Sequence, residues 1–141
     1  MDCTVYFRAA RIMLRNKCIK VEYIMSCLFH SLSYFIPETS LSIRQHICNY
    51  LEANNTIIDG LETKDILNME SVDYIQSMRN PSTWGGGIEI QAACNIWKIS
   101  INVHDIRGDT NSIICFIPVV TEVLKTINIS WNGGHYEPIM I

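Results

Sequence analysis

Apolar residues in the first two thirds of the chain recur every three or four positions, the spacing of helices that pack on one face. In the clearest case, Leu28, Leu32 and Phe35 share a face, Ser26 precedes them as an N-cap, and Pro37 follows as a stop. The pattern predicts helices at residues 27–36, 41–53, 65–78 and 88–97, the third broken near residues 70–71. Residues 56–64, which contain an Asp-Gly pair, are predicted to form a loop.

The last third of the chain has the composition of β-strands. Runs rich in Ile, Val and aromatic residues predict strands at residues 99–104, 113–117, 127–131 and 137–141. Helices followed by a β meander predict an α+β domain, with the helices packed on a small, mostly antiparallel sheet. With 141 residues, of which 48% are hydrophobic, the chain is long enough to form a single core.

Charge argues against a nucleic-acid partner, because the net charge is -3. Five of the 11 Lys and Arg residues lie in the first 20 positions, where Arg8, Arg11 and Arg15 form one helical stripe. We predict a basic helix at residues 1–20, docked on a domain of residues 21–141; the alternative is a targeting or membrane-surface helix. No apolar run reaches the ~18 residues of a membrane span, so a soluble protein is expected.

The cysteines indicate both compartment and chemistry. The six Cys residues form no C-x-x-C pair and no signal-peptide core is present, so reduced thiols and a cytoplasmic location are expected. Cys27 lies in the first turn of a predicted helix, where the helix dipole is expected to lower the thiol pKa. Cys48, Cys94 and Cys115 lie among apolar neighbours and are expected to be buried and inert. Cys27 is therefore the candidate nucleophile.

A candidate general base lies near the C-terminus. His135 follows the Asn-Gly-Gly turn at residues 132–134 and opens the last predicted strand, and Glu137 projects from the same face two residues later. A carboxylate there would fix the imidazole tautomer that presents its other nitrogen to a thiol. By contrast, His30 shares a helix with Cys27, and His46 and His104 are expected at the surface. The alternative is that Cys27 and His135 are ordinary structural residues.

Three sequence blocks resemble the OTU (ovarian tumour) family of cysteine deubiquitinases. They are S-C-L-F-H-S-L at residues 26–32, W-G-G-G-I-E-I-Q-A-A at residues 84–93 and W-N-G-G-H-Y-E-P-I at residues 131–139. Ile43-Arg44 and residues 73–78 also look like the family, so that the resemblance covers residues 20–141. The compact size resembles that of a viral or other divergent member, which would act in the host cytoplasm against innate signalling.

The resemblance implies a papain-like thiol hydrolase that cleaves the bond after the C-terminal Gly-Gly of ubiquitin, without metal or cofactor. Cys27 matches the family nucleophile, His135 the general base and Glu137 the residue that orients the base. The loop at Ile24, Met25 and Ser26 would provide the oxyanion site. Tyr136, with Gly134 and Trp131, would flank the groove for the ubiquitin tail. Ubiquitin chains, and by extension ubiquitin-like modifiers, are the implied partners.

One departure from the family leaves alternatives open. Most members have Asp-Gly-Asn before the nucleophile, where this chain has Ile24-Met25-Ser26. Losing one oxyanion donor costs roughly 10² to 10³ in rate. The first alternative is therefore a catalytically inactive OTU-like module that binds ubiquitin or another protein. The second is an adaptor that acts at membrane surfaces through the basic N-terminal stripe.

Overall fold

The computed structural model describes residues 25–67, 70, 73–108, 112–120 and 122–140. The basic helix predicted at residues 1–20, its boundary with the following domain, and Ile24 lie outside these residues. Within the described part of the chain, no helix is both long enough and apolar enough to cross a membrane.

The predicted helices are confirmed, with small changes at their ends. They are α3 (Cys27–Ser33), α4 (Ser40–Glu52), α5 (Thr63–Leu67), α6 (Tyr74–Met78) and α7 (Gly87–Trp97). Helix α4 begins where the Thr39 side chain accepts a hydrogen bond from the Ser42 amide at 3.1 Å. It ends before Asn54, whose φ of 56° is the left-handed conformation that asparagine tolerates. The helix predicted at residues 65–78 is two short helices, so the expected break is real.

The predicted loop at residues 56–64 is wrong. The segment contains a hairpin of β1 (Thr56–Ile58) and β2 (Leu61–Glu62), followed by the start of α5. The Asp-Gly pair forms its turn, with Gly60 at a φ of 84°. Ile57 is buried between two exposed neighbours and anchors the hairpin to the core. Three-residue alternation is too short a pattern to separate such a strand from a loop.

The main sheet has the strand order β4-β3-β5-β6. Its strands are β3 (Ile99–Asp105), β4 (Ser112–Phe116), β5 (Lys125–Trp131) and β6 (Tyr136–Ile139). The β3–β4 and β5–β6 pairs are antiparallel, but β5 runs parallel to β3. The expected meander is therefore corrected, because after β4 the chain returns to the other edge of β3. The α+β class, with helices on a small, mostly antiparallel sheet, is confirmed.

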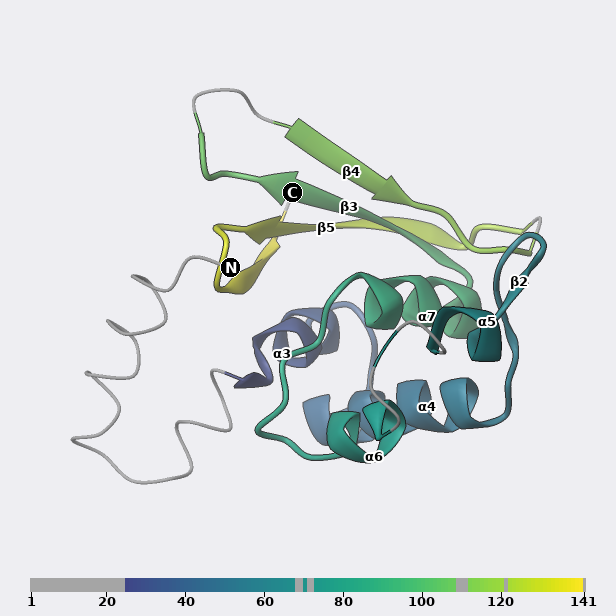
Figure 1. Cartoon of the computed structure of the whole chain (residues 1–141). Coiled ribbons are helices and arrows are strands. Elements are labelled where there is room, and N and C mark those ends of the chain that lie inside the picture. The colour runs from purple at the N-terminus through teal and green to yellow at the C-terminus, as the bar shows by residue number, and fades with distance from the viewer. Residues whose placement is uncertain (1–24, 68–69, 71–72, 109–111, 121, 141) are drawn as a thin grey trace.

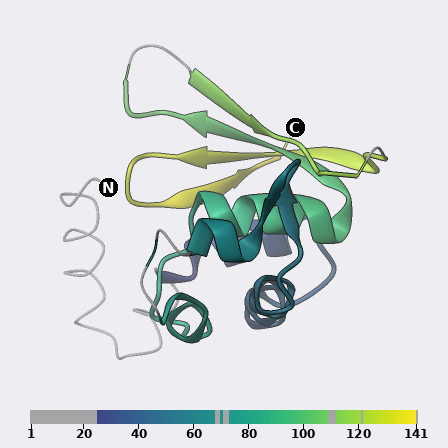
Figure 2. The ribbon, with the colours of Figure 1, turned by 45° about the vertical axis from the view of Figure 1, so that its right-hand side comes forward.

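The helices cover one face of this sheet (Figure 1). Helix α7 lies next to the strands, and α4 and α6 form a further layer below it, an arrangement also visible in the rotated view (Figure 2). The core between α7 and the sheet is made by Ile90 and Ala93 of the helix and by Ile99, Ile101 and Ile129 of the strands. Helix α3 packs against both α4 and β6. This position carries the first residue of α3, Cys27, to the edge of the sheet.

Gly85, in the W-G-G-G block before α7, allows close packing against α3. A Cβ added to Gly85 would lie 2.8 Å from Leu28 Cδ2 and 2.9 Å from Phe29 Cζ. Leu28 and Phe29 are fully buried, so neither side chain has free space into which it could move. Gly85 therefore fixes how closely the segment before α7 approaches α3.

We expect Gly85→Ala to lower the free energy of unfolding by about 1–3 kcal/mol, because the added methyl overpacks the core. Gly87→Ala is the matched control, since its Cβ would approach Phe116 no closer than 4.0 Å. Urea unfolding followed by circular dichroism measures both. Equal stabilities of the two variants would contradict the close packing.

Candidate active site

The first residue of α3 is held in place by the core. Leu28, Phe29 and Leu32 are each no more than 1% exposed and anchor the helix on its buried side. Ser31 adds a hydrogen bond from its hydroxyl to the Cys27 carbonyl at 2.8 Å. The Cys27 side chain is buried at the start of the helix. The thiol is therefore fixed by packing on a regular element.

A tight turn between β5 and β6 places His135 near the start of α3. Gly133, with a φ of 100°, allows the chain to reverse between β5 and β6. The Asn132 amide donates to the His135 carbonyl at 3.2 Å, and the Gly134 amide donates to Asn132 Oδ1 at 3.0 Å. The Asn-Gly-Gly sequence thus forms the predicted turn and places His135 directly before β6.

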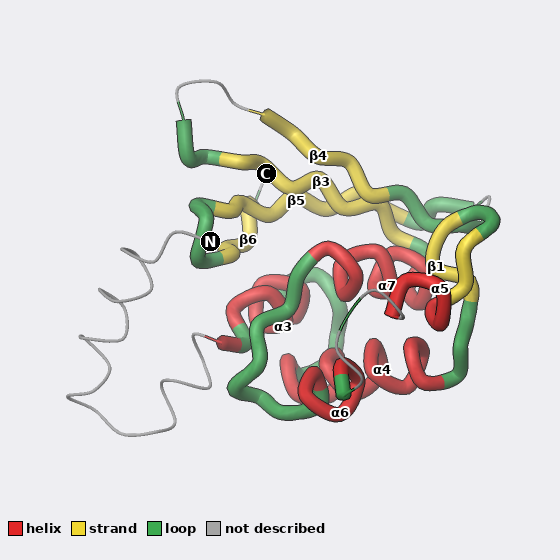
Figure 3. Tube along the Cα trace, viewed as in Figure 1, coloured by secondary structure: helices red, strands yellow, loops and turns green. Residues whose placement is uncertain are grey.

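Helix α3 and strand β6 meet at the candidate nucleophile. The backbone amide of Tyr136 donates to Cys27 Sγ at 3.4 Å, a contact between residues 109 positions apart. Figure 3 shows the β5–β6 turn and α3 next to each other. A pocket of about 290 Å³ opens there, lined by Cys27, His30, Ser31, Tyr34, His135, Tyr136, Glu137 and Pro138. The structure therefore brings the three predicted catalytic residues to one pocket.

The imidazole of His135 is oriented by Glu137. His135 Nε2 lies 3.4 Å from Glu137 Oε1, as expected for two residues on one face of a strand. This contact leaves Nδ1 as the nitrogen available to a thiol. The His135 side chain is 26% exposed, whereas that of Glu137 is 67% exposed. Solvent therefore weakens the electrostatic effect of the carboxylate, which acts mainly as a hydrogen-bond acceptor.

The expectation of a lowered Cys27 pKa is wrong. Burial raises the pKa of the Cys27 thiol, because a thiolate loses hydration there. Backbone N–H groups of Tyr136, Leu28 and Cys27, together with the positive charge of Arg44, oppose this effect without cancelling it. The dipole argument failed because it did not include burial. A thiol of this kind needs a base to take its proton when it reacts.

The other described cysteines divide into two groups. Burial raises the pKa of Cys48 to about 11 and that of Cys94 to about 12, so both are inert as expected. Cys115, in contrast, is exposed, which corrects its predicted burial. It belongs to β4, an edge strand that leaves Ile113 and Ile114 about half exposed as well. An apolar run alone does not distinguish such an edge strand from a buried one.

The other histidines are bound elsewhere or line the pocket wall. His104 Nε2 lies 2.9 Å from Asn128 Oδ1 on the neighbouring strand, and His46 pairs with Glu38 at 3.2 Å. His30 lines the pocket, with Nε2 3.4 Å from Ser40 Oγ. Burial, followed by the charge of Arg44, lowers the pKa of His30 and favours its neutral form. His135 is the histidine that a carboxylate orients beside Cys27.

The residues predicted for the oxyanion loop and the groove take different places. Ser26 occupies the N-cap position of α3 without capping it, because its hydroxyl donates to the Pro81 carbonyl at 3.0 Å. Tyr136 lines the pocket, whereas Trp131 stacks on Tyr136 outside it and Gly134 belongs to the turn before His135. Burial raises the pKa of Tyr136 to about 12, so its hydroxyl stays neutral. The groove role of these residues stays a prediction.

Sequence reasoning missed two contributions to the site. The backbone amide of Tyr136 bonds the thiol, and no side-chain pattern signals a main-chain donor. Arg44 is 1% exposed, although a charged residue on a helix is ordinarily expected at the surface. Its place in the helical repeat, three and four positions before the buried Ile47 and Cys48, was the available signal. Glu89 accepts a hydrogen bond from the Gly86 amide at 2.8 Å.

Comparison with known proteins decides the family. The family model described as OTU-like cysteine protease matches residues 9–132, which is most of the chain. This chain belongs to the OTU family. The match ends three residues before His135, so the β6 side of the OTU site is described by its geometry alone.

Two curated OTU relatives and one solved structure are similar to most of this chain. Ubiquitin thioesterase OTU1 of Dictyostelium discoideum is 26% identical over 82% of this chain and 35% of its own length. OTU domain-containing deubiquitinating enzyme 9 of Arabidopsis thaliana is 28% identical over 85% and 34%. An OTU domain solved in complex with ubiquitin is 28% identical, with a TM-score of 0.63 over 81% of this chain and 63% of that one. The chain thus spans about a third of the length of these curated relatives.

Differences in burial should give the described cysteines different rates of modification by a thiol reagent. At about pH 8, roughly one Cys48 thiol in a thousand is ionised. The ionised fraction of the Cys94 thiol is smaller still. We expect iodoacetamide to modify exposed Cys115 at least about tenfold faster than Cys48 or Cys94 in the folded protein, with the difference lost in urea. Peptide mass spectrometry measures each rate. Equal rates in the folded state would contradict the described burial.

Proposed function

We propose that this chain is a cysteine-dependent deubiquitinase that hydrolyses the isopeptide bond after the C-terminal Gly-Gly of ubiquitin. The observation that carries the proposal is the pocket shared by Cys27 and the Glu137-oriented His135. Two relatives are named as a ubiquitin thioesterase and a deubiquitinating enzyme, and the similar solved domain was bound to ubiquitin. Ubiquitin chains are the proposed substrates, and ubiquitin-like modifiers with the same tail chemistry are further candidates.

In the proposed mechanism, His135 Nδ1 takes the proton of the Cys27 thiol as sulfur attacks the carbonyl carbon of the terminal ubiquitin glycine. Backbone N–H groups at the start of α3 stabilise the oxyanion of the tetrahedral intermediate, and the Tyr136 N–H, which bonds Cys27 Sγ, stabilises the thiolate as it forms. When the intermediate collapses, the C–N bond breaks and His135 returns the proton to the leaving lysine amine. Water, deprotonated by His135, then attacks the thioester and releases the ubiquitin carboxylate and the Cys27 thiol.

The main competing proposal is an inactive OTU-like module that binds ubiquitin. It is favoured by the burial of Cys27, which is 2% exposed, and by the replacement of Asp-Gly-Asn with Ile24-Met25-Ser26. The two proposals differ in chemistry rather than in recognition. The enzyme must form a covalent bond through Cys27, whereas the module binds ubiquitin equally well without that thiol.

We expect a ubiquitin probe with a C-terminal electrophile to form a covalent adduct with the protein, seen as a gel shift. Cys27→Ala should abolish the adduct, and His135→Ala should slow its formation by about 10² to 10⁴ because the base is lost. Cys115→Ala and His104→Ala are the matched controls and should react normally. A folded protein that binds the probe without forming an adduct would support the inactive module instead.

Glu137 should contribute less to the rate of hydrolysis than His135 does. Its contribution should come mainly from accepting a hydrogen bond from the His135 imidazole. Because the carboxylate is largely exposed, its charge is screened. We expect Glu137→Gln, which retains an acceptor, to lower kcat/KM for a ubiquitin C-terminal amide by about two- to threefold. Glu137→Ala should lower it by about tenfold. A loss in Glu137→Gln as large as in His135→Ala would show that the charge itself is required.

A further inference from the structure

A buried positively charged side chain, that of Arg44, contacts the residues that precede Cys27. The guanidinium of Arg44, on α4, is 1% exposed and lies over the Phe29 ring, 4.1 Å from its centroid. Its Nη1 donates to the Met78 carbonyl at 2.8 Å. Its Nη2 donates to Ser26 Oγ at 3.0 Å and lies within hydrogen-bond distance of two carbonyls, that of Pro81 at 3.3 Å and that of Met25 at 3.4 Å. One side chain thus bonds the residues before α3, the last residue of α6 and Pro81 in the segment that follows.

The contacts define the loop before Cys27. Because the Met25–Ser26 peptide is trans, a carbonyl directed toward Arg44 places the Ser26 N–H on the opposite side of the peptide. The Ser26 hydroxyl accepts from Arg44 and donates to Pro81, so both of its bonds are used across the loop instead of capping α3. Arg44 therefore fixes the orientation of the two residues that precede the nucleophile.

The contacts of Arg44 require a fork of donors, not only a side chain that fills the space. Among the described residues, no carboxylate forms an ion pair with Arg44, and its acceptors are neutral oxygens and the Met78 sulfur. Burying a charge in this way is costly, and well-packed apolar side chains often replace buried charges without loss of stability. What an apolar residue cannot supply is a planar fork of donors directed at several acceptors.

We propose that Arg44 is a positioning residue, which holds Met25 and Ser26 so that the Cys27 thiol and the amides at the start of α3 keep their geometry toward β6. The inference rests on the proposed thiol chemistry of Cys27. The positive charge of Arg44 acts in the same direction, since it lowers the pKa of Cys27 against the effect of burial.

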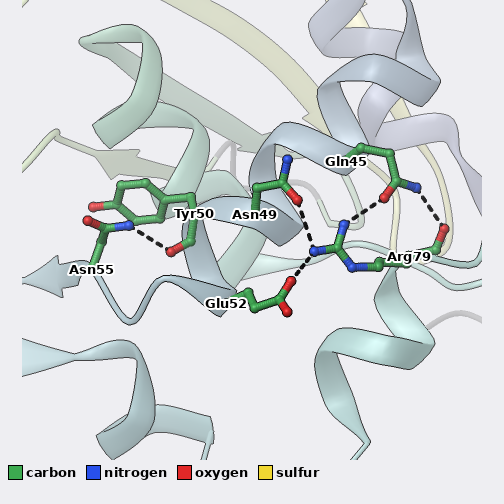
Figure 4. A network of polar contacts seen from close by, with 6 residues as sticks. All are labelled: Gln45, Asn49, Tyr50, Glu52, Asn55 and Arg79. Carbon is green, nitrogen blue, oxygen red and sulfur yellow. Dashed lines mark hydrogen bonds and ion pairs between the residues drawn. The ribbon is translucent and has the colours of Figure 1, made fainter.

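A second arginine provides a matched control. Arg79 also ties α4 to the segment after α6, donating to Gln45 Oε1 and to Asn49 Oδ1, each at 2.9 Å, and pairing with Glu52 (Figure 4). Its network lies on α4 away from the loop before Cys27, and none of its bonds reaches Met25 or Ser26. Substitution of Arg79 therefore tests the link between the helices without touching the nucleophile loop.

The test compares Arg44→Lys with Arg79→Lys, because lysine retains the charge but loses the fork. We expect Arg44→Lys to lower kcat for a ubiquitin C-terminal amide by about ten- to hundredfold, with KM changed by less than about threefold. The pH midpoint of Cys27 alkylation by iodoacetamide should also rise in Arg44→Lys, because the backbone amides that oppose the effect of burial lose their orientation although the charge is retained. Arg79→Lys should lower the melting temperature and leave kcat and the midpoint unchanged.

Ser26→Ala keeps the test decisive if Arg44→Lys does not fold. It removes only the hydroxyl that joins Arg44 to Pro81 and should change kcat and the alkylation midpoint in the same directions by smaller amounts. Wild-type kcat and midpoint in folded Arg44→Lys, or in Ser26→Ala where Arg44→Lys is unfolded, would overturn the proposal. So would an equal loss in Arg79→Lys. If the wild-type protein does not cleave ubiquitin, the deubiquitinase proposal fails and the alkylation midpoint alone decides the role of Arg44.

Discussion

The hydrogen bond from the Tyr136 amide to Cys27 Sγ is the contact on which the site depends, because it joins two elements from opposite ends of the described chain. The positions of α3 and β6 are set by tertiary packing and not by the local sequence of either element. Helix α3 is held by the burial of Leu28, Phe29 and Leu32 between α4 and the sheet, and β6 is held by its pairing with β5. The pocket is therefore a product of the whole core, and the register of β6 determines where His135 lies.

The same packing that fixes the thiol also makes it harder to ionise. A buried thiolate loses hydration, and in this protein backbone amides and one buried guanidinium replace part of it. Such fixed donors need no reorganisation when charge develops during a reaction. The site thus combines a thiol that stays protonated at rest with an imidazole whose Nε2 is the nitrogen paired with Glu137. This combination suits base-assisted attack better than a permanently ionised nucleophile.

The sequence predicted the local structure around the candidate site where the signal was local. The spacing of apolar residues located α3 and α4, and the Asn-Gly-Gly turn followed by His135 and Glu137 predicted both the reversal and the shared strand face. Predictions that depended on tertiary neighbours failed. The parallel pairing of β5 with β3, the exposure of Cys115 on an edge strand and the raised pKa of Cys27 follow from which elements lie side by side. Hydrophobic periodicity does not contain that information.

We propose that Cys27 forms a thioester with the C-terminal glycine of ubiquitin during turnover. The most direct measurement is acid quenching during turnover of a ubiquitin C-terminal amide, followed by intact and peptide mass spectrometry. We expect an adduct with the mass of ubiquitin minus water, located on the peptide that contains Cys27 and removed by hydroxylamine. Turnover without such an adduct, or an adduct located on another cysteine, would contradict it.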